Sequence, residues 1–224
     1  MPNPEVLQSG TFYHIFNRGI NGENLFHCEA HFQHFLGLYS TYIDPVAETY
    51  AWVLMPNHFH LLVRIKADIQ YRCQKPNGAN ERDLKEFELR KWETVTISSD
   101  ELPETKTPVP FRHFSHLFNA YTKYFNKKTS RHGNLFERPF KRKEIENSNY
   151  LKNVVIYINH NPVHHGFCLQ PSDYPWSSYL TCISVKHTKL QRDSVIGWFD
   201  NEANFVHLHN GKVEVEQIEH WLEL

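Results

Sequence analysis

The stretch that most constrains the fold runs from Met55 to Val63 and reads MPNHFHLLV. After a Pro-Asn turn, the side chains alternate in the pattern of a strand. The preceding run from Thr49 (TYAWVLM) is rich in β-branched and aromatic residues, so the two runs together predict a β-hairpin over residues 49–66. In such a strand His58 and His60 share one face. Two imidazoles side by side on a rigid strand can hold a metal ion.

The His-x-His spacing is weak evidence by itself. With 16 histidines in 224 residues, a random order gives about one such pair. A second pair, His207 and His209, lies in a polar tail without a strand pattern, and we predict that it is solvent-exposed. The hairpin context, together with a matching helix later in the chain, distinguishes His58 and His60.

Composition indicates a soluble globular chain. At 224 residues with 40% hydrophobic content, one domain with extensions is expected. The opening MPNPEVLQSG is polar, and no run approaches the roughly 18 apolar residues of a membrane span, so a cytoplasmic location is the expectation. The cysteines are scattered without CxxC spacing and are predicted to be reduced thiols. They are Cys28, Cys73, Cys168 and Cys182.

Charge is balanced overall but unevenly distributed. Between Tyr121 and Lys143 eight basic residues face one acid, whereas from Gln191 onward seven acids face two basic residues. The basic run can follow a nucleic-acid phosphate backbone, with Phe136 or Phe140 stacking an unpaired base; the alternative is a solvated helix end and edge strand. The candidate DNA-binding residues are Lys123, Lys127, Lys128, Arg131, Arg138, Lys141, Arg142 and Lys143.

Hydrophobic periodicity predicts the order β, α, β, β, α, β, α. The predicted segments are strand 11–18, helix 28–43, hairpin 49–66, helix 111–128, strand 134–145 and a helix from residue 148 that ends at Pro162. This order favours an α+β fold, a ferredoxin-like (RRM-like) antiparallel sheet with helices packed on one face.

Two segments fall outside this pattern. Residues 67–110 are polar and are predicted to form a surface insertion, with a helix over 80–93. Residues 184–224 form an acidic C-terminal extension to a domain of residues 1–183, and one hypothesis is that this tail shields the basic run.

The last predicted helix carries the second half of a candidate site. Its core stripe is Leu151, Val154, Val155 and Ile158. Tyr157 and Asn161 lie one turn apart on one flank of that stripe, so a phenol and an amide oxygen stand side by side at the edge of the sheet. Taken separately, Tyr157 is interpreted as a rim-packing aromatic and Asn161 as helix-end chemistry before proline.

Several ordered motifs together resemble the HUH-superfamily single-tyrosine transposases, above all the REP-associated tyrosine transposases and their insertion-sequence relatives. The motifs are the His-hydrophobic-His strand, YINHNPV at 157–163, YHIFNRG at 13–19, YFN at 124–126, GNLFE at 133–137 and DYPWSSY at 173–179. The resemblance covers about residues 11–180, apart from the insertion. Residues 67–110 and the tail after Ile183 depart from the family pattern.

The resemblance implies a metal-dependent DNA transposase, active in DNA transposition and recombination. Tyr157 is then the nucleophile, and His58, His60 and Asn161 hold Mg²⁺ or Mn²⁺. Such an enzyme cuts single-stranded DNA through a 5′-phosphotyrosine link and rejoins strands. The rival nucleophiles Tyr121 and Tyr124 are predicted to pack in the core.

The implied partner is single-stranded DNA with a hairpin, such as a transposon end or a REP-like element. The protein is expected to bind it as a monomer or homodimer, and no membrane is expected to take part. Two alternatives stay open at this point. One is a domesticated hairpin-DNA-binding protein that does not cut. The other is a metal phosphodiesterase that uses water, in which Tyr157 is dispensable.

Overall fold

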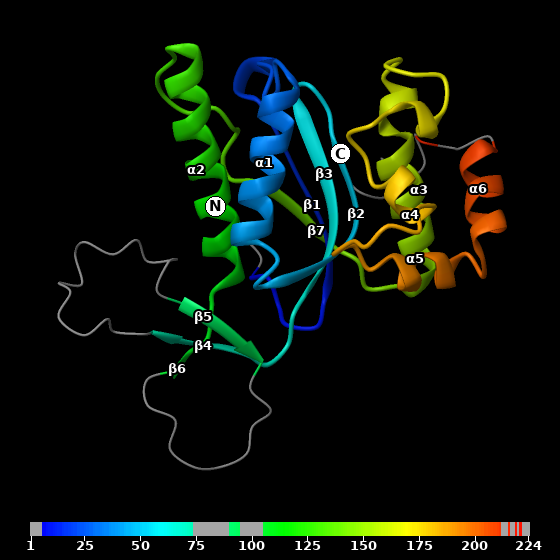
Figure 1. Cartoon of the computed structure of the whole chain (residues 1–224), viewed down its shortest axis with the longest axis horizontal. Helices are drawn as coiled ribbons and strands as arrows, with labels where there is room; N and C mark the ends of the chain where they lie inside the picture. The colour runs from blue at the N-terminus through cyan, green and yellow to red at the C-terminus, as the bar shows by residue number, and fades with distance from the viewer. Residues whose placement is uncertain are drawn as a thin grey trace.

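A computed structural model describes residues 6–73, 90–94, 105–211, 215, 218 and 220. Its centre is a four-stranded antiparallel sheet with the order β2-β3-β1-β7 (Figure 1). The strands are β1 (Phe12–Arg18), β2 (Ala47–Leu54), β3 (His58–Ile65) and β7 (Lys141–Glu144). The hairpin prediction is confirmed, as is the ferredoxin-like arrangement.

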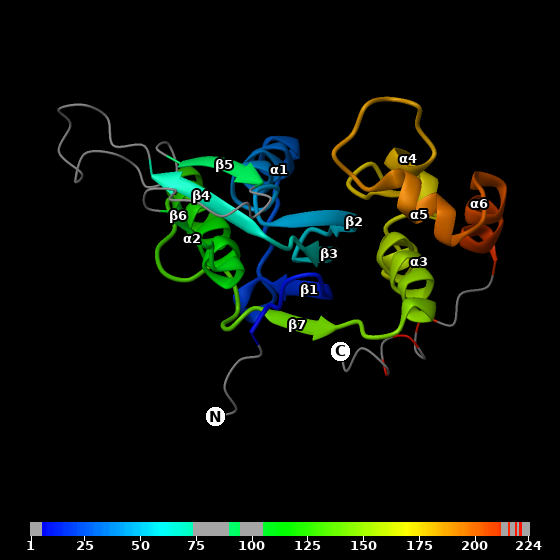
Figure 2. The same cartoon turned by 90° about the horizontal axis from the view of Figure 1, so that it is seen from below.

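Helices α1 (Glu29–Tyr42) and α2 (Pro110–Thr129) cover one face of this sheet (Figure 2). Every second side chain of the strands points toward these helices, and the side chains at these positions are apolar. Phe59 and Leu61 of β3 join Tyr13 and Ile15 of β1 in this core. Figure 2 also shows that helix α3 (Ser148–His164) lies on the other side of the sheet, where Val154 and Ile158 pack against Val53 and Leu62.

Helix α3 runs past the predicted end at Pro162 to His164. A proline removes one backbone hydrogen bond and strains the preceding turn, but it does not force an immediate stop when the helix ends within two residues. The predicted boundary was therefore wrong by two residues.

The segment before β7 is irregular, although a strand was predicted over residues 134–145. Only Lys141–Glu144 pairs with β1, and Phe136 makes an isolated bridge to Gly19. Pro139 cannot donate to a ladder, which limits the strand on its N-terminal side. The rings of Phe136 and Phe140 are 4% and 6% exposed, so the prediction that one of them stacks a base was wrong.

The insertion forms a small three-stranded sheet. Its strands are β4 (Ile69–Cys73), β5 (Arg90–Thr94) and β6 (Thr105–Lys106). The helix predicted over 80–93 lies outside the described residues up to 89, and it is wrong for Arg90 to Glu93, which are extended in β5.

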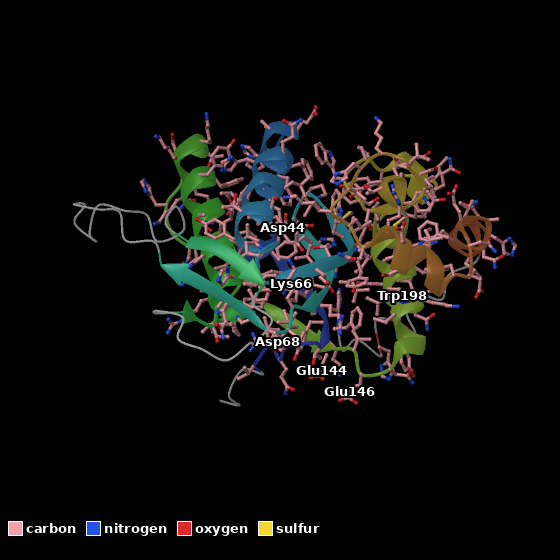
Figure 3. All side chains as sticks on the ribbon, turned by 60° about the horizontal axis from the view of Figure 1, so that its bottom comes forward. Asp44, Lys66, Asp68, Glu144, Glu146 and Trp198 are labelled. Atoms are coloured by element: carbon pink, nitrogen blue, oxygen red, sulfur yellow. The ribbon has the colours of Figure 1, made fainter. Side chains whose placement is uncertain are left out.

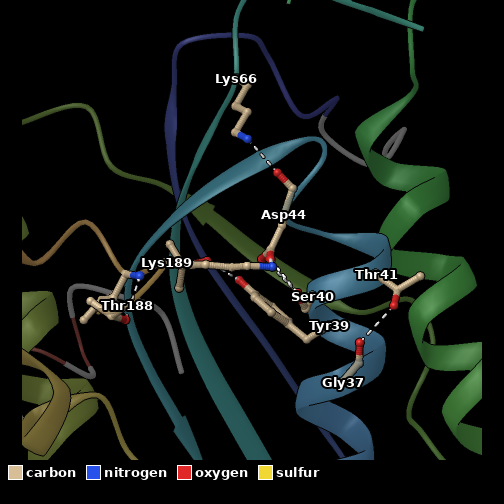
Figure 4. Close-up of polar contacts among 10 residues, drawn as sticks. Gly37, Tyr39, Ser40, Thr41, Asp44, Lys66, Thr188 and Lys189 are labelled. Carbon is tan, nitrogen blue, oxygen red and sulfur yellow. Dashed lines mark hydrogen bonds and ion pairs between the residues drawn. The ribbon is translucent and has the colours of Figure 1, made fainter. Parts of the chain in front are cut away.

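The C-terminal segment packs back onto the sheet and α3. Its elements are the single turn η2 (Pro171–Asp173) and the helices α4 (Tyr179–Cys182), α5 (Arg192–Trp198) and α6 (Glu202–Asn210). A further single turn, η1 (Ile20–Gly22), follows β1. Lys189 pairs with Asp44 at 2.8 Å and donates to Ser40 Oγ at 2.6 Å (Figure 4). The backbone N–H of Gln191 donates to the Thr49 carbonyl at 2.8 Å. These contacts hold the segment against α1 and β2.

The two histidines of the second pair, His207 and His209, are both on α6 but differ in solvent exposure. His207 is exposed as predicted, but His209 is fully buried, so the prediction of a solvated pair was wrong. Sequence reasoning missed this because the apolar partners of His209 lie in short elements with little periodicity: Phe199 directly follows α5, and Phe205 is on α6.

No helix in the described ranges is long and apolar enough to cross a membrane. Cys28, Cys168 and Cys182 are free thiols.

Candidate active site

The turn that begins β3 fixes His58. The 19–26 loop packs on this turn, because Gly19 N–H donates to the Asn57 carbonyl and Leu25 N–H donates to the Pro56 carbonyl. Gly19 has no room for a side chain, since a Cβ there would lie 1.9 Å from the Glu23 carbonyl oxygen. The Asn57 Oδ1 atom lies 2.7 Å from His58 Nδ1. An N–H at Nδ1 therefore leaves a lone pair on Nε2.

His60 is oriented by a histidine that sequence analysis missed. Its Nδ1 lies 2.9 Å from His14 Nε2, and the two rings stack at 5.1 Å. His14 comes from β1, on the same sheet face as His60, and it is completely buried. If Nδ1 of His60 donates to His14, its Nε2 keeps a lone pair for a ligand. The alternation of β1 places His14 on one side and Ile15 on the other, but strand register was needed to find the pair.

Helix α3 brings the other two predicted residues to these imidazoles. The Tyr157 ring centroid lies 5.3 Å from that of His60, with the rings nearly perpendicular. One turn later, Asn161 Oδ1 lies 2.8 Å from His58 Nε2. Tyr157, His58, His60 and Asn161 therefore come together although the strand and the helix are far apart in the sequence.

A cavity of about 440 Å³ opens at this point. That volume is within the range of small-molecule sites, roughly 300–1,000 Å³. Tyr157, His58 and His60 line it, although Tyr157 is only 2% exposed. The other lining residues are Phe16, Asn17, Arg18, Asn24, Pro56, Asn57, Glu137, Lys141, His165 and Phe167.

Burial keeps the site imidazoles neutral. It lowers the pKa of His58 to about 4 and that of His14 to about 3. The pKa of His60 is well below its usual value for the same reason, and the neighbouring histidines His14 and His58 lower it further. Metal ligation requires a neutral imidazole, so the ligand candidates His58 and His60 need no deprotonation near pH 7.

The donor set fits a divalent cation. Two neighbouring ligands, each about 2.1 Å from an octahedral ion, lie about 3.0 Å apart, close to the 2.8 Å between His58 Nε2 and Asn161 Oδ1. In this orientation of Asn161 the oxygen faces His58, while the buried Nδ2 has no hydrogen-bond partner. Within the described part of the chain, no group of three or more His, Cys, Asp or Glu side chains could hold a metal. Any ion here therefore depends on the amide.

Three of the cationic residues near the cavity are suited to phosphate. Arg18 and Lys141 line it, and Arg18 is held by Glu137 at 2.6 Å while its side chain stays 63% exposed. Lys143 is paired with His14 across β1 and β7, so it shares the face of the site. Sequence analysis predicted Lys141 and Lys143 but missed Arg18.

The other predicted DNA-binding residues do not line the cavity. Lys123, Lys127 and Lys128 are exposed on α2, which lies on the opposite face of the sheet. Arg131 is paired with Glu23 at 2.6 Å, and Arg138 donates to Asn119. The guanidinium of Arg142 lies 5.2 Å from the Phe111 and Phe140 ring centroids. The basic run is thus divided between two faces.

The far end of the sheet carries charged residues of both signs. His58 pairs with Arg18 at the end of β1, whereas Glu144 pairs with Tyr13 and Arg64 with Phe12 near its start. Figure 3 labels Lys66 as well as Asp68, Glu144 and Glu146.

The rival tyrosines are in the core region, as predicted. Tyr121 is fully buried and donates to the Leu25 carbonyl at 2.6 Å, and burial raises its pKa. Tyr124 stacks on His34 with ring centroids 3.6 Å apart. Neither residue lines the cavity.

Two aromatic rings at the cavity were not predicted. Phe16 lies under Lys141 and stacks on His14. Phe167 follows α3, lines the cavity and is 53% exposed. His165 lies with its ring 5.0 Å from that of His58. The helical period could have placed His165 one turn after Asn161, but no pattern marks the two rings.

Comparison with solved structures finds a similar chain, described as a REP-associated tyrosine transposase bound to a REP hairpin. The match covers 82% of this chain and 85% of the other, with a TM-score of 0.50 and 18% identity. The chain has the fold of a tyrosine transposase. No protein-family model matches the sequence, and no curated protein matches it. The transposase fold agrees with the arrangement expected from the motifs, while the roles of individual residues rest on the geometry above.

Proposed function

We propose that this protein is a metal-dependent single-stranded DNA endonuclease and strand transferase that acts through Tyr157. The observation that carries the proposal is the convergence of Asn161 on His58, at 2.8 Å, with the Tyr157 ring beside His60 in the same cavity. A core tyrosine needs no such neighbours. The fold shared with a transposase whose structure contains a REP hairpin supports the same conclusion.

The chemistry is a phosphoryl transfer to tyrosine. The Tyr157 oxygen forms a bond to phosphorus while the bond from phosphorus to the 3′-oxygen breaks. Tyrosine loses its hydroxyl proton and the departing 3′-oxygen gains one, so the products are a 5′-phosphotyrosine and a free 3′-hydroxyl. Attack by a second 3′-hydroxyl reverses these changes and joins a new strand. His58, His60 and Asn161 would hold Mg²⁺ or Mn²⁺, which offsets the charge on the scissile phosphate.

The DNA would lie along the cavity side of the sheet, next to the edge strand β7. Arg18 and Lys141 lie at the cavity and Lys143 follows along the edge strand, so they can contact successive phosphates. Phe167 offers a ring on which an unpaired base can stack. Lys123, Lys127 and Lys128 on the far face would instead contact a longer or folded part of the DNA, such as a hairpin stem.

The test is a covalent-adduct assay with the full chain. A labelled pool of hairpin oligonucleotides with randomised stems and flanking single strands is incubated with Mn²⁺ and run on a denaturing gel. The wild-type protein should retain label, and Tyr157→Phe should lose the adduct while binding the pool equally well. Tyr124→Phe is the matched control and should keep the adduct.

Other outcomes would overturn the proposal in distinct ways. Cleaved DNA without an adduct, unchanged in Tyr157→Phe, would indicate a phosphodiesterase that uses water. Binding without cleavage by the wild-type protein would indicate a hairpin-binding protein that does not cut.

A further inference from the structure

Helix α6 contacts the turn of α3 that carries the candidate catalytic groups. The residues between Tyr157 and Asn161 face away from the cavity, toward this C-terminal helix, and both Asn159 and His160 are buried. His209 of α6 lies against them and is fully buried. These contacts form a polar network in an otherwise apolar cluster.

The contacts of His209 fit an imidazole with its proton on Nδ1. In this assignment His209 Nδ1 donates to the Phe205 carbonyl at 2.7 Å and Nε2 accepts from Asn159 Nδ2 at 3.2 Å, while the Val155 carbonyl also interacts with the ring. Asn159 Oδ1 in turn accepts from Ser178 Oγ at 2.9 Å. His160 Nε2 donates to the His209 carbonyl in the last turn of α6. Burial lowers the pKa of His209 to about 4, so this imidazole is neutral near pH 7.

The anchored turn is also the weakest part of α3. Pro162 has no N–H, so the carbonyl of Ile158 lacks its usual helical partner. Asn161 lies within this interrupted turn. Side-chain bonds from Asn159 and His160 to α6 fix the turn from outside, at the point where its own backbone ladder is incomplete.

The same network reaches the sheet. Ser178 Oγ also accepts from the Trp52 N–H of β2 at 3.1 Å. Trp198, the last residue of α5, is labelled in Figure 3. Its ring stacks on that of Tyr50 of β2, with the ring centroids 5.1 Å apart. The C-terminal helices therefore connect α3 to the sheet that carries His58 and His60.

We propose that His209 is a positioning residue for the candidate active site: its imidazole, through Asn159, and its backbone carbonyl, through His160, fix the turn of α3 that presents Tyr157 and Asn161 to His58 and His60. The proposal rests on the proposed function for its catalytic consequence. The C-terminal extension is then part of the machinery and not an accessory shield. A displacement of about 1 Å in a reacting group can cost on the order of 100-fold in rate, so a small shift of this turn has a large effect.

The test compares three variants of the full chain. His209→Phe keeps an aromatic ring among Phe205 and Tyr179 but removes both side-chain hydrogen bonds. His209→Gln restores an acceptor for Asn159. His207→Ala on the exposed side of α6 is the matched control. The measurements are the first-order rate of adduct formation at saturating hairpin pool, the Kd for that pool, and the Mn²⁺ affinity in the absence of DNA.

His209→Phe should lower the adduct rate at least 10-fold and weaken Mn²⁺ binding, while the Kd for the pool changes less than 3-fold. His209→Gln should recover most of the rate, and His207→Ala should match the wild type. An unchanged rate and Mn²⁺ affinity in a folded His209→Phe protein would overturn the inference, as would a parallel loss of DNA binding. If the wild type forms no adduct, the proposed function fails, and the Mn²⁺ affinities alone decide the positioning role.

Discussion

His14 offers the sharpest test of how the sheet prepares a metal site. The His60 imidazole is neutral and has one proton to place. A metal ion on His60 Nε2 requires that proton on Nδ1, where His14 Nε2 at 2.9 Å can accept it. His14→Phe keeps a ring stacked on Phe16 but removes the acceptor. The His60 proton then has no buried partner at Nδ1 and shifts to Nε2, where it blocks ligation.

The cost follows from the loss of one buried partner. An unsatisfied buried donor costs about 1–3 kcal/mol, so Mn²⁺ should bind roughly 5- to 150-fold more weakly. The assay is titration of Mn²⁺ into the DNA-free protein, with free Mn²⁺ followed by electron paramagnetic resonance. His113→Phe is the control, because His113 is also buried and bonded, at 2.9 Å to the Tyr42 carbonyl, but lies outside the cavity. Wild-type affinity in His14→Phe would refute the reasoning.

Three further predictions test the surroundings of the site. Phe167→Ala should weaken binding of single-stranded DNA by about 1–3 kcal/mol, measured by fluorescence anisotropy. Leu169→Ala is the control and should have no effect, because Leu169 is 93% exposed and outside the cavity lining. Equal DNA affinities of Phe167→Ala and the wild type would exclude stacking on Phe167. Tyr121→Phe should lower the free energy of unfolding by about 1 kcal/mol in urea and preserve the DNA adduct, and loss of the adduct would make Tyr121 a nucleophile. Burial lowers the pKa of His209 to about 4, so below pH 6.5 the unfolded state binds more protons than the folded state. The free energy of unfolding should therefore fall as the pH drops from 6.5 toward 4, by about 3 kcal/mol for this group alone. A urea midpoint that stays constant over this pH range would contradict the prediction.

Local patterns were sufficient for the sheet and for the face on which each candidate site residue lies within its own strand or helix. Alternation in β3 placed His58 and His60 on one face, and the helical period placed Tyr157 and Asn161 on one flank of α3. Each inference depends only on the geometry of one element. The approach of the two segments followed from the resemblance and not from any local pattern.

The parts that sequence analysis missed depend on long-range packing. His14 pairs with His60 because β1 and β3 are neighbours in a particular register, which no local spacing encodes. His209 was placed in solvent because its burial comes from α3 and α5, which follow from tertiary contacts alone. The basic run was treated as one surface, whereas β7 and α2 carry its parts to opposite faces of the sheet.

The most direct test of the central claim is to locate the covalent bond. After incubation of the wild-type protein with the hairpin pool and Mn²⁺, nuclease and trypsin digestion would leave a short nucleotide on a peptide that fragmentation can sequence. The account predicts a 5′-phosphonucleotide on Tyr157, within the peptide that starts at Asn153 and ends at Lys186. A nucleotide on any other residue of the chain would contradict it.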